Sequence, residues 1–410
     1  MSEAWYYALG GERRGPVTRE VLDRLAREGT IAPGVMVWAP GLPGWVDAAS
    51  VEGLPLAPPP PPLPVPVAPP ASTAAPDRGF LGGIAARISA ASDLPTISAM
   101  PVARMLVGGL GQSTRTEDVE ELLTVGTRVT TPLLADVPSG WPMPRIFWRI
   151  LGGALATYFL LYLGVAQFRN FNFFPGLIVV GSFVVPFSVV VLFFELNTPR
   201  NVSVYQVGKM LLLGGTLSLV ATVFLFDVIP GSGVGSLLPA LLTGVTEETG
   251  KALALLIVLG SRRYRWQLNG LLFGAAVGAG FAGFESAGYA MRAALGANSI
   301  GAAVDSVTLR ALLSPGGHVI WTAMVGSALW RVKGDRPFAA GMFFHRDVRR
   351  RWGIAVLLHG LWDANLFLHP FLKLFGLVVV GWYLVFAILK QALGEVEEAR
   401  AAAGAPASAP

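Results

Sequence analysis

From Phe147 onward the chain consists of long apolar runs separated by short polar segments. Each run has about 20 residues, the length that a helix rising about 1.5 Å per residue needs to cross the hydrocarbon of a bilayer. The pattern therefore predicts a mainly α-helical, polytopic membrane bundle of about eight spans. We place the spans near residues 147–167, 174–194, 205–227, 236–260, 268–291, 313–330, 352–369 and 371–390.

In residues 1–54 the apolar stretches are shorter, and strand-like and helix-like patterns alternate, as is typical of a small α+β domain. The stretches WYYA at 5–8 and VMVW at 35–38 have the composition of strands. The glycines and proline of GGERRGP at 10–16 predict a turn after the first strand. Thr18 precedes apolar residues at helical spacing, so an amphipathic helix is expected to start there.

The segment between this domain and the spans divides into two parts. Residues 55–76 are a proline-rich linker, and PLAPPPPPLPVPVAPP at 55–70 predicts an extended polyproline II conformation. Residues 77–144 contain short amphipathic patterns, but their Gly, Ser, Thr and Pro content is typical of a loosely ordered region beside the membrane. The membrane domain follows at 145–393, and we assign residues 394–410 to a disordered tail.

Composition supports this organisation, since 53% of the residues are hydrophobic and only 14% are charged. Most Lys and Arg lie in short loops between apolar runs, where they orient spans and do not indicate nucleic-acid binding. The arginine clusters at 262–265 and 346–351 predict cytoplasmic loops, and with them cytoplasmic N- and C-termini in the cell membrane. The chain contains no Cys, which excludes disulfides and thiolate chemistry.

Several predicted spans contain ionisable residues. Each such residue costs about 2.5 to 3.5 kcal/mol near the bilayer centre, so it usually faces a cavity and has a function. The polar residues and their aromatic neighbour are Glu247, Glu248 and Lys251 in the fourth span, Phe281 and Glu285 in the fifth, His318 in the sixth, and His359 and Asp363 in the seventh. Because four spans place these groups at similar depth, we expect them to converge in one hydrated pocket.

These residues lie in motifs that resemble those of the PrsW family of intramembrane proteases, relatives of the CAAX prenyl protease and bacteriocin-processing superfamily. The motifs are EETGK at 247–251, LNGLLFGAAVGAG at 268–280, FAGFE at 281–285, His318 in GGHVIWTAMVG, and HGLWD at 359–363. The resemblance covers about residues 235–368. It implies cleavage of a peptide bond in a membrane-anchored protein, such as an anti-sigma-type regulator.

The chemistry of these side chains is consistent with peptide hydrolysis. The reaction needs a base to activate water, a group to stabilise the oxyanion and an acid for the leaving amine. We assign these catalytic roles to Glu247, Glu248, Glu285, His318 and His359. Adjacent residues differ by about 100° around a helix, so one glutamate can face the pocket while the other forms an ion pair. Which of the two is the base stays open.

Three further residues are assigned supporting roles: Lys251 as a counter-ion, Asp363 as a group that orients a histidine, and Phe281 as packing. In an alternative mechanism His318, His359 and Glu285 hold a zinc ion with one open coordination position, as in metalloproteases. The HExxH pattern of many zinc proteases is absent. The sequence therefore leaves both the glutamate mechanism and the zinc mechanism open.

The N-terminal unit resembles the bacterial GYF-like (GYF_2) domain. The resemblance rests on the leading aromatic pair and on Gly15, Pro16, Val37, Trp38, Gly41, Gly44 and Trp45. In this class such aromatic residues form a groove for proline-rich peptides. The groove residues implied here are Trp5, Tyr6, Trp38 and Trp45, with residues 55–70 or a separate protein as ligand. The same tryptophans are equally suited to form the core of so small a domain.

Two other functions fit the intramembrane charges. An ion- or proton-coupled transporter also uses buried Glu, His and Asp as proton relays. Such transporters often contain two related halves, and we find no internal repeat. The third function is a non-catalytic scaffold that binds proline-rich partners through the N-terminal domain. Cleavage of a membrane-anchored peptide distinguishes the protease from both.

Overall fold

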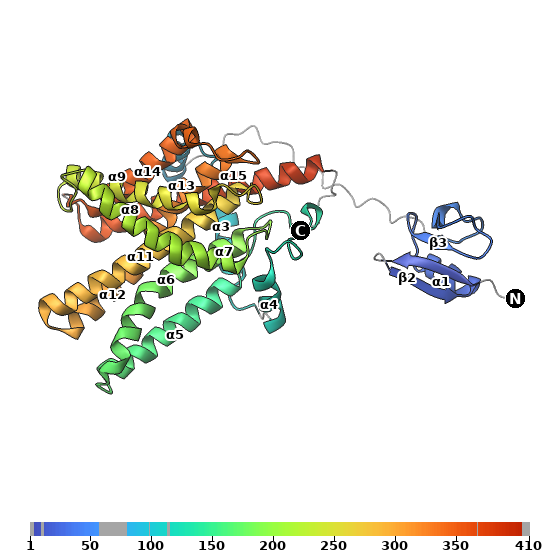
Figure 1. Cartoon of the computed structure of the whole chain (residues 1–410), viewed down its shortest axis with the longest axis horizontal. Helices are drawn as coiled ribbons and strands as arrows, with labels where there is room; N and C mark the ends of the chain where they lie inside the picture. The colour runs from blue at the N-terminus through green and yellow to red at the C-terminus, as the bar shows by residue number, and fades with distance from the viewer. Residues whose placement is uncertain are drawn as a thin grey trace. The chain divides into compact units, whose positions relative to one another are not determined.

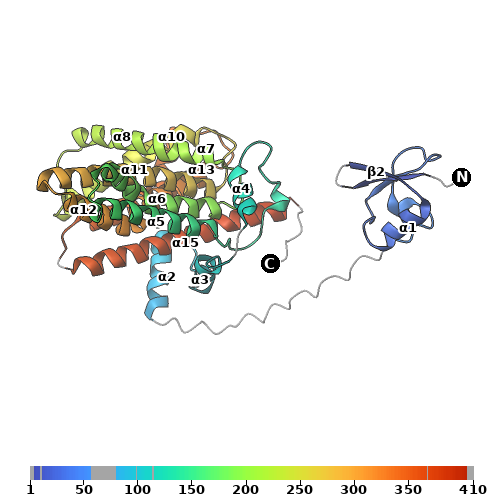
Figure 2. The ribbon, with the colours of Figure 1, turned by 90° about the horizontal axis from the view of Figure 1, so that it is seen from below.

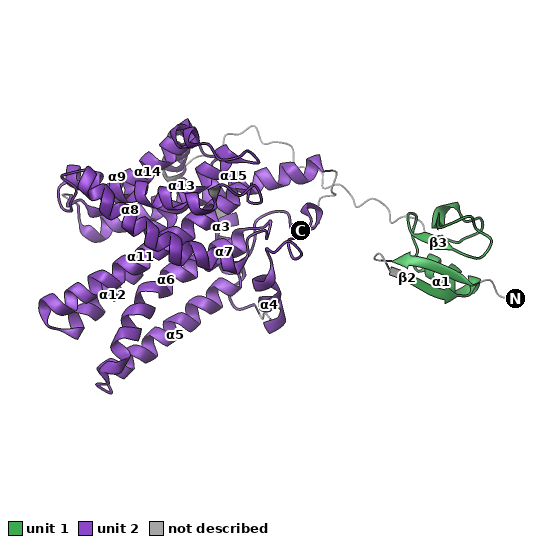
Figure 3. Ribbon diagram, in the orientation of Figure 1, with its two compact units in different colours: residues 1–77 green, residues 78–410 purple. Residues whose placement is uncertain are grey.

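The computed structural model describes residues 4–9, 12–56, 80–97, 99–112, 115–366 and 368–403. These residues belong to two compact units, 1–77 and 78–410, shown in different colours in Figure 3. Each unit has a hydrophobic core of its own. Most of the predicted proline-rich linker, residues 57–76, lies outside the described residues.

The first unit is a four-stranded antiparallel sheet with one helix. Its elements are β1 Trp5–Leu9, β2 Glu12–Val17, α1 Arg19–Arg27, β3 Met36–Trp38, β4 Val46–Asp47 and a 3-10 turn at Ala48–Ser50. The strand order is β2-β1-β3-β4, and Tyr6 of β1 lies opposite Trp38 of β3. The helix predicted after Thr18 is confirmed as α1, and the Thr18 side chain accepts a hydrogen bond from the Val21 N–H.

One sequence prediction about this unit was wrong. Glu12–Val17, expected to be part of a turn, forms strand β2 and pairs with β1. This strand lies at the edge of the sheet, and the side chains of Arg13 and Arg14 are exposed. Because an edge strand can hydrogen bond through its backbone without burying side chains, β2 lacks the apolar alternation from which strands are predicted.

The second unit is built from helices (Figure 1). They are α2 Phe80–Ser92, α3 Ala99–Gly108, α4 Thr116–Thr124, α5 Ile146–Ala166, α6 Phe174–Leu196, α7 Val204–Lys209, α8 Gly215–Val228, α9 Leu237–Ala254, α10 Leu256–Leu259, α11 Gln267–Ala297, α12 Ile300–Leu313, α13 His318–Lys333, α14 Arg346–Asp363 and α15 Pro370–Ala402. A π-helical turn at Met210–Gly214 joins α7 to α8, and 3-10 turns lie at Leu134–Asp136, Phe171–Phe173, Ser314–Gly316 and Ala340–Phe344.

Five helical segments among the described residues are long and apolar enough to cross a membrane. They are Ile146–Ala166, Phe171–Leu196, Val204–Val228, Gln267–Ala297 and Pro370–Ala402. The other three predicted spans correspond to α9, α13 and α14, which have 16 to 18 residues and contain most of the charged groups described below. The described residues thus contain five apolar helical segments of membrane-spanning length, and the total of eight spans stays a prediction.

Helix α12 was not predicted. Its 14 residues are too few for a span, and they include Asp305 and Arg310. A local signal for its start exists, because Ser299 caps the helix by accepting a hydrogen bond from the Ala302 N–H. The helix packs against α6 and α11. It therefore adds residues to the site from a stretch that the apolar pattern left unassigned.

Helix α11 is the centre of the second unit, and every residue from Gln267 to Gly283 is buried. Figure 2 shows α11 and α13 between α8 on one side and α15 on the other. Glycines allow α11 and α13 to touch through their backbones. A Cβ atom on Gly274 would lie 2.3 Å from the backbone carbonyl oxygen of Thr322, and one on Gly278 would lie 2.3 Å from the backbone carbonyl oxygen of His318. Small residues at such spacing are typical of close helix pairs in membranes.

A second close pair is formed by α9 and α14. A Cβ atom on Gly244 would lie 2.8 Å from the Val356 oxygen, and one on Gly360 would lie 2.9 Å from the Leu241 Cα. Any larger side chain at either glycine would push these helices apart. The two glycine-joined pairs, α11 with α13 and α9 with α14, contain the site residues that were predicted from the sequence.

The segments flanking the apolar helices are more ordered than expected. Residues 77–144, predicted to be loosely ordered, contain α2, α3 and α4. Ser89 of α2 forms a 2.6 Å hydrogen bond with Tyr383 of α15, and Met105 of α3 is buried. Helix α15 continues to Ala402, so the predicted tail is helical up to that residue. Buried Val396 explains the difference, because the last turns pack on the core.

Candidate active site

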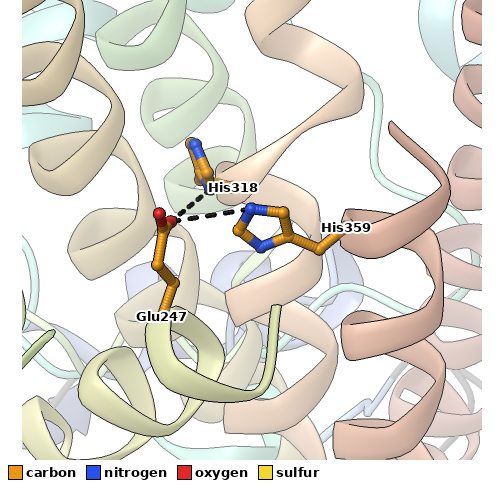
Figure 4. A group of neighbouring side chains, drawn as sticks. All are labelled: Glu247, His318 and His359. Carbon is orange, nitrogen blue, oxygen red and sulfur yellow. Dashed lines mark ion pairs between the residues drawn. The ribbon is translucent and has the colours of Figure 1, made fainter. Parts of the chain in front are cut away.

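The predicted catalytic side chains meet inside the second unit. Glu247 comes from α9, His318 from the first residue of α13, and His359 from α14. Figure 4 shows the Glu247 carboxylate directed toward both imidazole rings. Its Oε2 atom lies 3.9 Å from Nδ1 of His318 and 3.6 Å from Nε2 of His359. Ion-pair distances of this kind require the three helices to pack closely, and the glycines of the two helix pairs permit that packing.

Lys251 joins the two adjacent glutamates one helical turn away. Its Nζ lies 3.2 Å from Oε2 of Glu247 and 2.8 Å from Oε1 of Glu248. The Lys251 side chain is fully buried and its Nζ is 4.0 Å from the centre of the Phe281 ring. The structure therefore gives Lys251 the contacts of a counter-ion, and Phe281 adds a cation–π contact to its packing role.

Glu248 faces away from the cavity and contacts the back of His359. Its Oε1 atom accepts a 2.9 Å hydrogen bond from Nδ1 of His359. The Oε2 atom has no hydrogen-bond partner among the described residues, although it is buried. Because Lys251 and His359 bind the same oxygen, this carboxylate orients the ring of His359 and leaves Nε2 directed toward Glu247.

His318 is held between a cation and a carboxylate. Its Nδ1 accepts a hydrogen bond from Lys251 over 2.8 Å, and its Nε2 donates to Oε2 of Glu285 over 3.1 Å. The same Glu285 oxygen accepts a hydrogen bond from Arg310 of α12. Glu285 therefore lies behind His318 and forms an ion pair there.

Asp363 lies at the C-terminal end of α14, one turn beyond His359. Its Oδ2 atom is 3.4 Å from Nε2 of His359, which agrees with the predicted orienting role. The Asp363 backbone oxygen also accepts a 3.1 Å hydrogen bond from the N–H of Gly235, in the loop before α9. This loop and the end of α14 are therefore fixed to each other beside the site.

The site opens into a cavity of about 700 Å³. Six of the predicted residues line it: Glu247, Phe281, Glu285, His318, His359 and Asp363. Apolar side chains from α8, α12 and α14 line other parts of the wall, including Val223, Leu309 and Trp362. A cavity with convergent polar groups and apolar walls is typical of a binding or active site.

Sequence reasoning missed several residues of this site. Arg310 binds both Glu285 and Ser286, yet nothing in the chain pattern connects α12 with α11 across the intervening residues. Trp321 stacks on His359 with ring centres 4.8 Å apart, and it contacts His318 edge-on. A signal for Trp321 was present, because it follows His318 by three residues and so lies on the same helical face.

Three side chains are arranged so that they could hold a metal ion. Ligand atoms of Glu247, His318 and His359 all lie within 4.8 Å of one another. Two imidazoles and a carboxylate are the donor set of many catalytic zinc sites. Each imidazole also has a carboxylate on its other nitrogen, as metal-bound histidines usually do, namely Glu285 or Glu248.

The donor set therefore fits zinc, with two differences from expectation. The third ligand of the group is Glu247, whereas Glu285 was predicted; the Glu285 carboxylate is occupied by Arg310 and by the far side of His318. In addition, Nζ of Lys251 lies 2.8 Å from Nδ1 of His318, so a cation bound at that nitrogen would displace this contact.

In the first unit the four predicted groove residues differ in exposure. Trp5 is buried in the core and is 5% exposed, so its role there is packing. Trp45 is 41% exposed. Tyr6 and Trp38 are half-buried, and their ring centres lie 5.7 Å apart on neighbouring strands. The accessible aromatic surface thus consists of Tyr6, Trp38 and Trp45 without Trp5.

Comparison with known proteins gives two matches to family sequence models. Residues 202–389 match the PrsW family intramembrane metalloprotease, and residues 5–54 match GYF domain 2. Comparisons with curated proteins and with solved structures gave no match. The first match begins at α7 and so extends beyond the motifs to the helices that surround them. The chain therefore contains one region, residues 5–54, that is similar to GYF domain 2 and a second region, residues 202–389, that is similar to the PrsW family of intramembrane metalloproteases.

Proposed function

We propose that the protein hydrolyses a peptide bond of a membrane-anchored protein, with water activated by Glu247 and with His318 and His359 in support. The observation that carries this proposal is the position of the Glu247 carboxylate, which lines the cavity within 4 Å of both imidazoles. A base must lie within hydrogen-bond reach of the water that it deprotonates. Among the two adjacent glutamates only Glu247 borders the cavity.

Glu248 acts as a positioning residue in this mechanism. Its buried carboxylate binds Lys251 and Nδ1 of His359, so the Nε2 atom of His359 is directed to the reacting centre. A carboxylate behind a catalytic imidazole fixes the orientation of the ring. Glu285 acts in the same way behind His318, with Arg310 as its counter-ion.

His359 supplies the donor at the reacting carbonyl because its Nε2 is directed toward Glu247, whereas both nitrogens of His318 already have partners in Lys251 and Glu285. An imidazole that is protonated on the cavity side donates a hydrogen bond to the oxyanion of the tetrahedral intermediate. Glu247 takes a proton from the attacking water and passes it to the nitrogen of the leaving amine as the C–N bond breaks. Burial of the site excludes bulk water and strengthens these interactions.

The net charge of the site can be neutralised in two ways, either by protonated imidazoles or by a bound metal ion. Four carboxylates face two permanent cations, and the groups concerned are Glu247, Glu248, Glu285, Asp363, Lys251 and Arg310. Two protonated imidazoles would neutralise the excess negative charge, with loss of the hydrogen bond that Nδ1 of His318 accepts from Lys251, and so would one divalent cation with neutral imidazoles. In the second form Glu247, His318 and His359 would hold the ion, which when bound would lower the pKa of a coordinated water.

The substrate class follows from the surroundings of the site. The apolar helices α8 and α11 form part of the cavity wall, so a peptide bond reaches the cavity most readily from a segment that is itself anchored in the membrane. An anti-sigma-type regulator is one protein of this kind. The positive-inside rule places the N-terminal domain and the C-terminus in the cytoplasm of a cell-membrane protein. There the GYF domain would bind a proline-rich segment through Tyr6, Trp38 and Trp45.

Cleavage of a membrane-anchored substrate by purified protein tests this proposal. Proteomics of membrane fractions with and without the gene would supply the substrate, as a single-span protein that is truncated only when the gene is present. The purified protein should cleave that substrate and lose the activity in Glu247→Gln. Loss with a chelator and recovery with zinc would identify the metal form. Substrate transport without cleavage would overturn the proposal.

A further inference from the structure

A second polar cavity lies where α13 ends and α14 begins. Its volume is about 390 Å³, and residues from α2, α13, α14 and α15 line it. None of these residues lines the candidate active site. The charged lining residues are Asp93, Arg331, Asp347, Arg350 and Arg351. Three guanidinium groups thus face two carboxylates, which gives the cavity an excess of positive charge.

Arg351 is the residue that distinguishes this cavity from an ordinary basic surface. It is only 4% exposed. Its Nη1 donates to Oγ of Ser327 over 2.5 Å and its Nη2 donates to Oε1 of Gln391 over 2.7 Å. Both acceptors are neutral, and no carboxylate of the described residues forms an ion pair with this guanidinium. Asp347 and Asp93 act on this guanidinium only from a distance, so a bound anion would offset the energetic cost of its burial.

The neighbouring arginines complete a site for such an anion. Nη1 of Arg350 lies 3.0 Å from Oδ2 of Asp93, which fixes the end of α2 beside α14. The exposed Arg331 borders the same cavity from the C-terminal turn of α13. Guanidinium groups present planar pairs of donors that match the oxygens of a phosphate. The cavity therefore has the charge and the donors that a phosphate group requires.

Orientation of the membrane helices does not account for this arrangement. The positive-inside rule needs basic residues near the ends of spans, but it does not need them buried. Arg349 fits that role, since it is exposed on α14 and does not line the cavity. Arg351, two residues later, is enclosed by side chains of α13 and α15. Because Arg351 is buried beside a cavity, we expect its guanidinium group to bind a ligand there.

We propose that this cavity binds a phosphate group, supplied by the headgroup of an anionic phospholipid. The cavity lies beside α15, one of the five apolar helices, so its ligand can remain in the bilayer. Basic pockets between membrane helices bind such headgroups at the membrane surface. The bound phosphate would connect α2, α13, α14 and α15 through Arg331, Arg350 and Arg351. This binding does not depend on the proposed protease activity.

Thermal unfolding of the purified full-length chain in an uncharged detergent tests the proposal. Dioctanoyl phosphatidylglycerol should raise the unfolding midpoint to a saturating value, whereas dioctanoyl phosphatidylcholine should leave it unchanged. Inorganic phosphate is the third compound to be tested in the same unfolding measurement. An equal, saturable rise with inorganic phosphate would identify a soluble phosphate as the source. No saturable rise with either anion, or an equal rise with phosphatidylcholine, would overturn the phosphate site.

Substitutions in the cavity separate a specific site from general attraction of anions. Arg351→Gln and Arg331→Gln should each raise the apparent dissociation constant about tenfold or more, because each removes charge-assisted hydrogen bonds. The matched control is Arg349→Gln, which removes the same charge from an exposed position and should leave binding unchanged. Equal weakening by all three variants would overturn the proposal. If Arg351→Gln yields little folded protein, the exposed Arg331 still decides the outcome.

Discussion

Nδ1 of His359 and Oε1 of Glu248 are joined by a 2.9 Å hydrogen bond in the interior, while the preceding residue, Glu247, borders the cavity. Two chemically identical side chains, adjacent in the sequence, therefore have different environments. One carboxylate can reach a water molecule in the cavity, and the other can act only through the imidazole that it orients. This difference makes the two glutamates distinguishable by experiment.

Glu247→Gln should reduce kcat by about 100-fold or more, because it removes the general base and retains the shape of the side chain. Glu248→Gln should reduce kcat about tenfold, as expected for a residue that orients another. His369→Ala is the control, since His369 is exposed at the start of α15. The measurement is cleavage of a membrane-anchored substrate at equal amounts of folded protein. A larger loss in Glu248→Gln than in Glu247→Gln would reverse the assignment.

Lys251→Met should destabilise the protein in addition to inactivating it. The substitution leaves Glu248 buried without its cation, and breaking a buried ion pair in this way costs about 3 to 5 kcal/mol. The double variant Lys251→Met with Glu248→Gln should regain much of the lost stability, because the uncompensated charge is gone. Thermal unfolding in detergent measures the stability of the single variant and of the double variant. An unchanged midpoint in Lys251→Met would show that the pair does not stabilise the fold.

Arg310→Gln should lower cleavage about tenfold through loss of the cation behind Glu285. The pH profile of kcat/KM should shift as well, since Glu285 contacts His318 directly. Arg310→Lys should recover part of the activity. Arg292→Gln is the matched control, because Arg292 lines the same cavity and contacts Tyr289. Lower activity with an unchanged pH profile would assign Arg310 a purely structural role.

Asp47 should make the GYF domain sensitive to acid. Its Oδ1 accepts hydrogen bonds from the N–H groups of Gly34 and Ala49, and these bonds lower the pKa of the carboxyl below its ordinary value of 3.8. A lowered folded-state pKa stabilises the fold above the unfolded value, and this contribution is lost as the pH falls through the folded value.

The acid sensitivity can be measured by tryptophan fluorescence of residues 1–77 during denaturant unfolding between pH 2 and pH 7, about the range in which carboxyl groups titrate. Asp47→Asn should be less stable than the parent at neutral pH and should lose less stability on acidification. Asp23→Asn is a suitable control on α1. A pH dependence that is the same in Asp47→Asn and in the parent would contradict this prediction.

Much of the site could be predicted from the sequence because charges are costly in an apolar run. That rule directs attention to Glu247, His318 and His359 without any knowledge of their contacts. It cannot separate Glu247 from Glu248, since their difference depends on where α14 packs against α9. Nor does it show that Arg310 pairs with Glu285, because that contact joins residues on different helices through tertiary packing.

The fold was predictable to a similar extent. Hydrophobic length locates helices α5, α6, α8, α11 and α15 well, since their composition matches the thickness of a membrane. It says less about short or polar elements. Helix α12 was missed because its 14 residues are too few for a membrane span, and strand β2 was missed because it lacks apolar alternation; both are stabilised by their neighbours.

The glycine-joined helix pairs divide the active-site residues between two bodies, each of which is one closely packed pair of helices. Glu285 and His318 belong to α11 and α13, whereas Glu247, Lys251 and His359 belong to α9 and α14. A shear of one body against the other would alter the 2.8 Å contact of Lys251 with His318 and the 3.9 Å separation of Glu247 from His318. It would preserve the 3.1 Å and 3.6 Å contacts within each body. Sliding of a fraction of a helical turn would thus disassemble the catalytic group while each half stays intact.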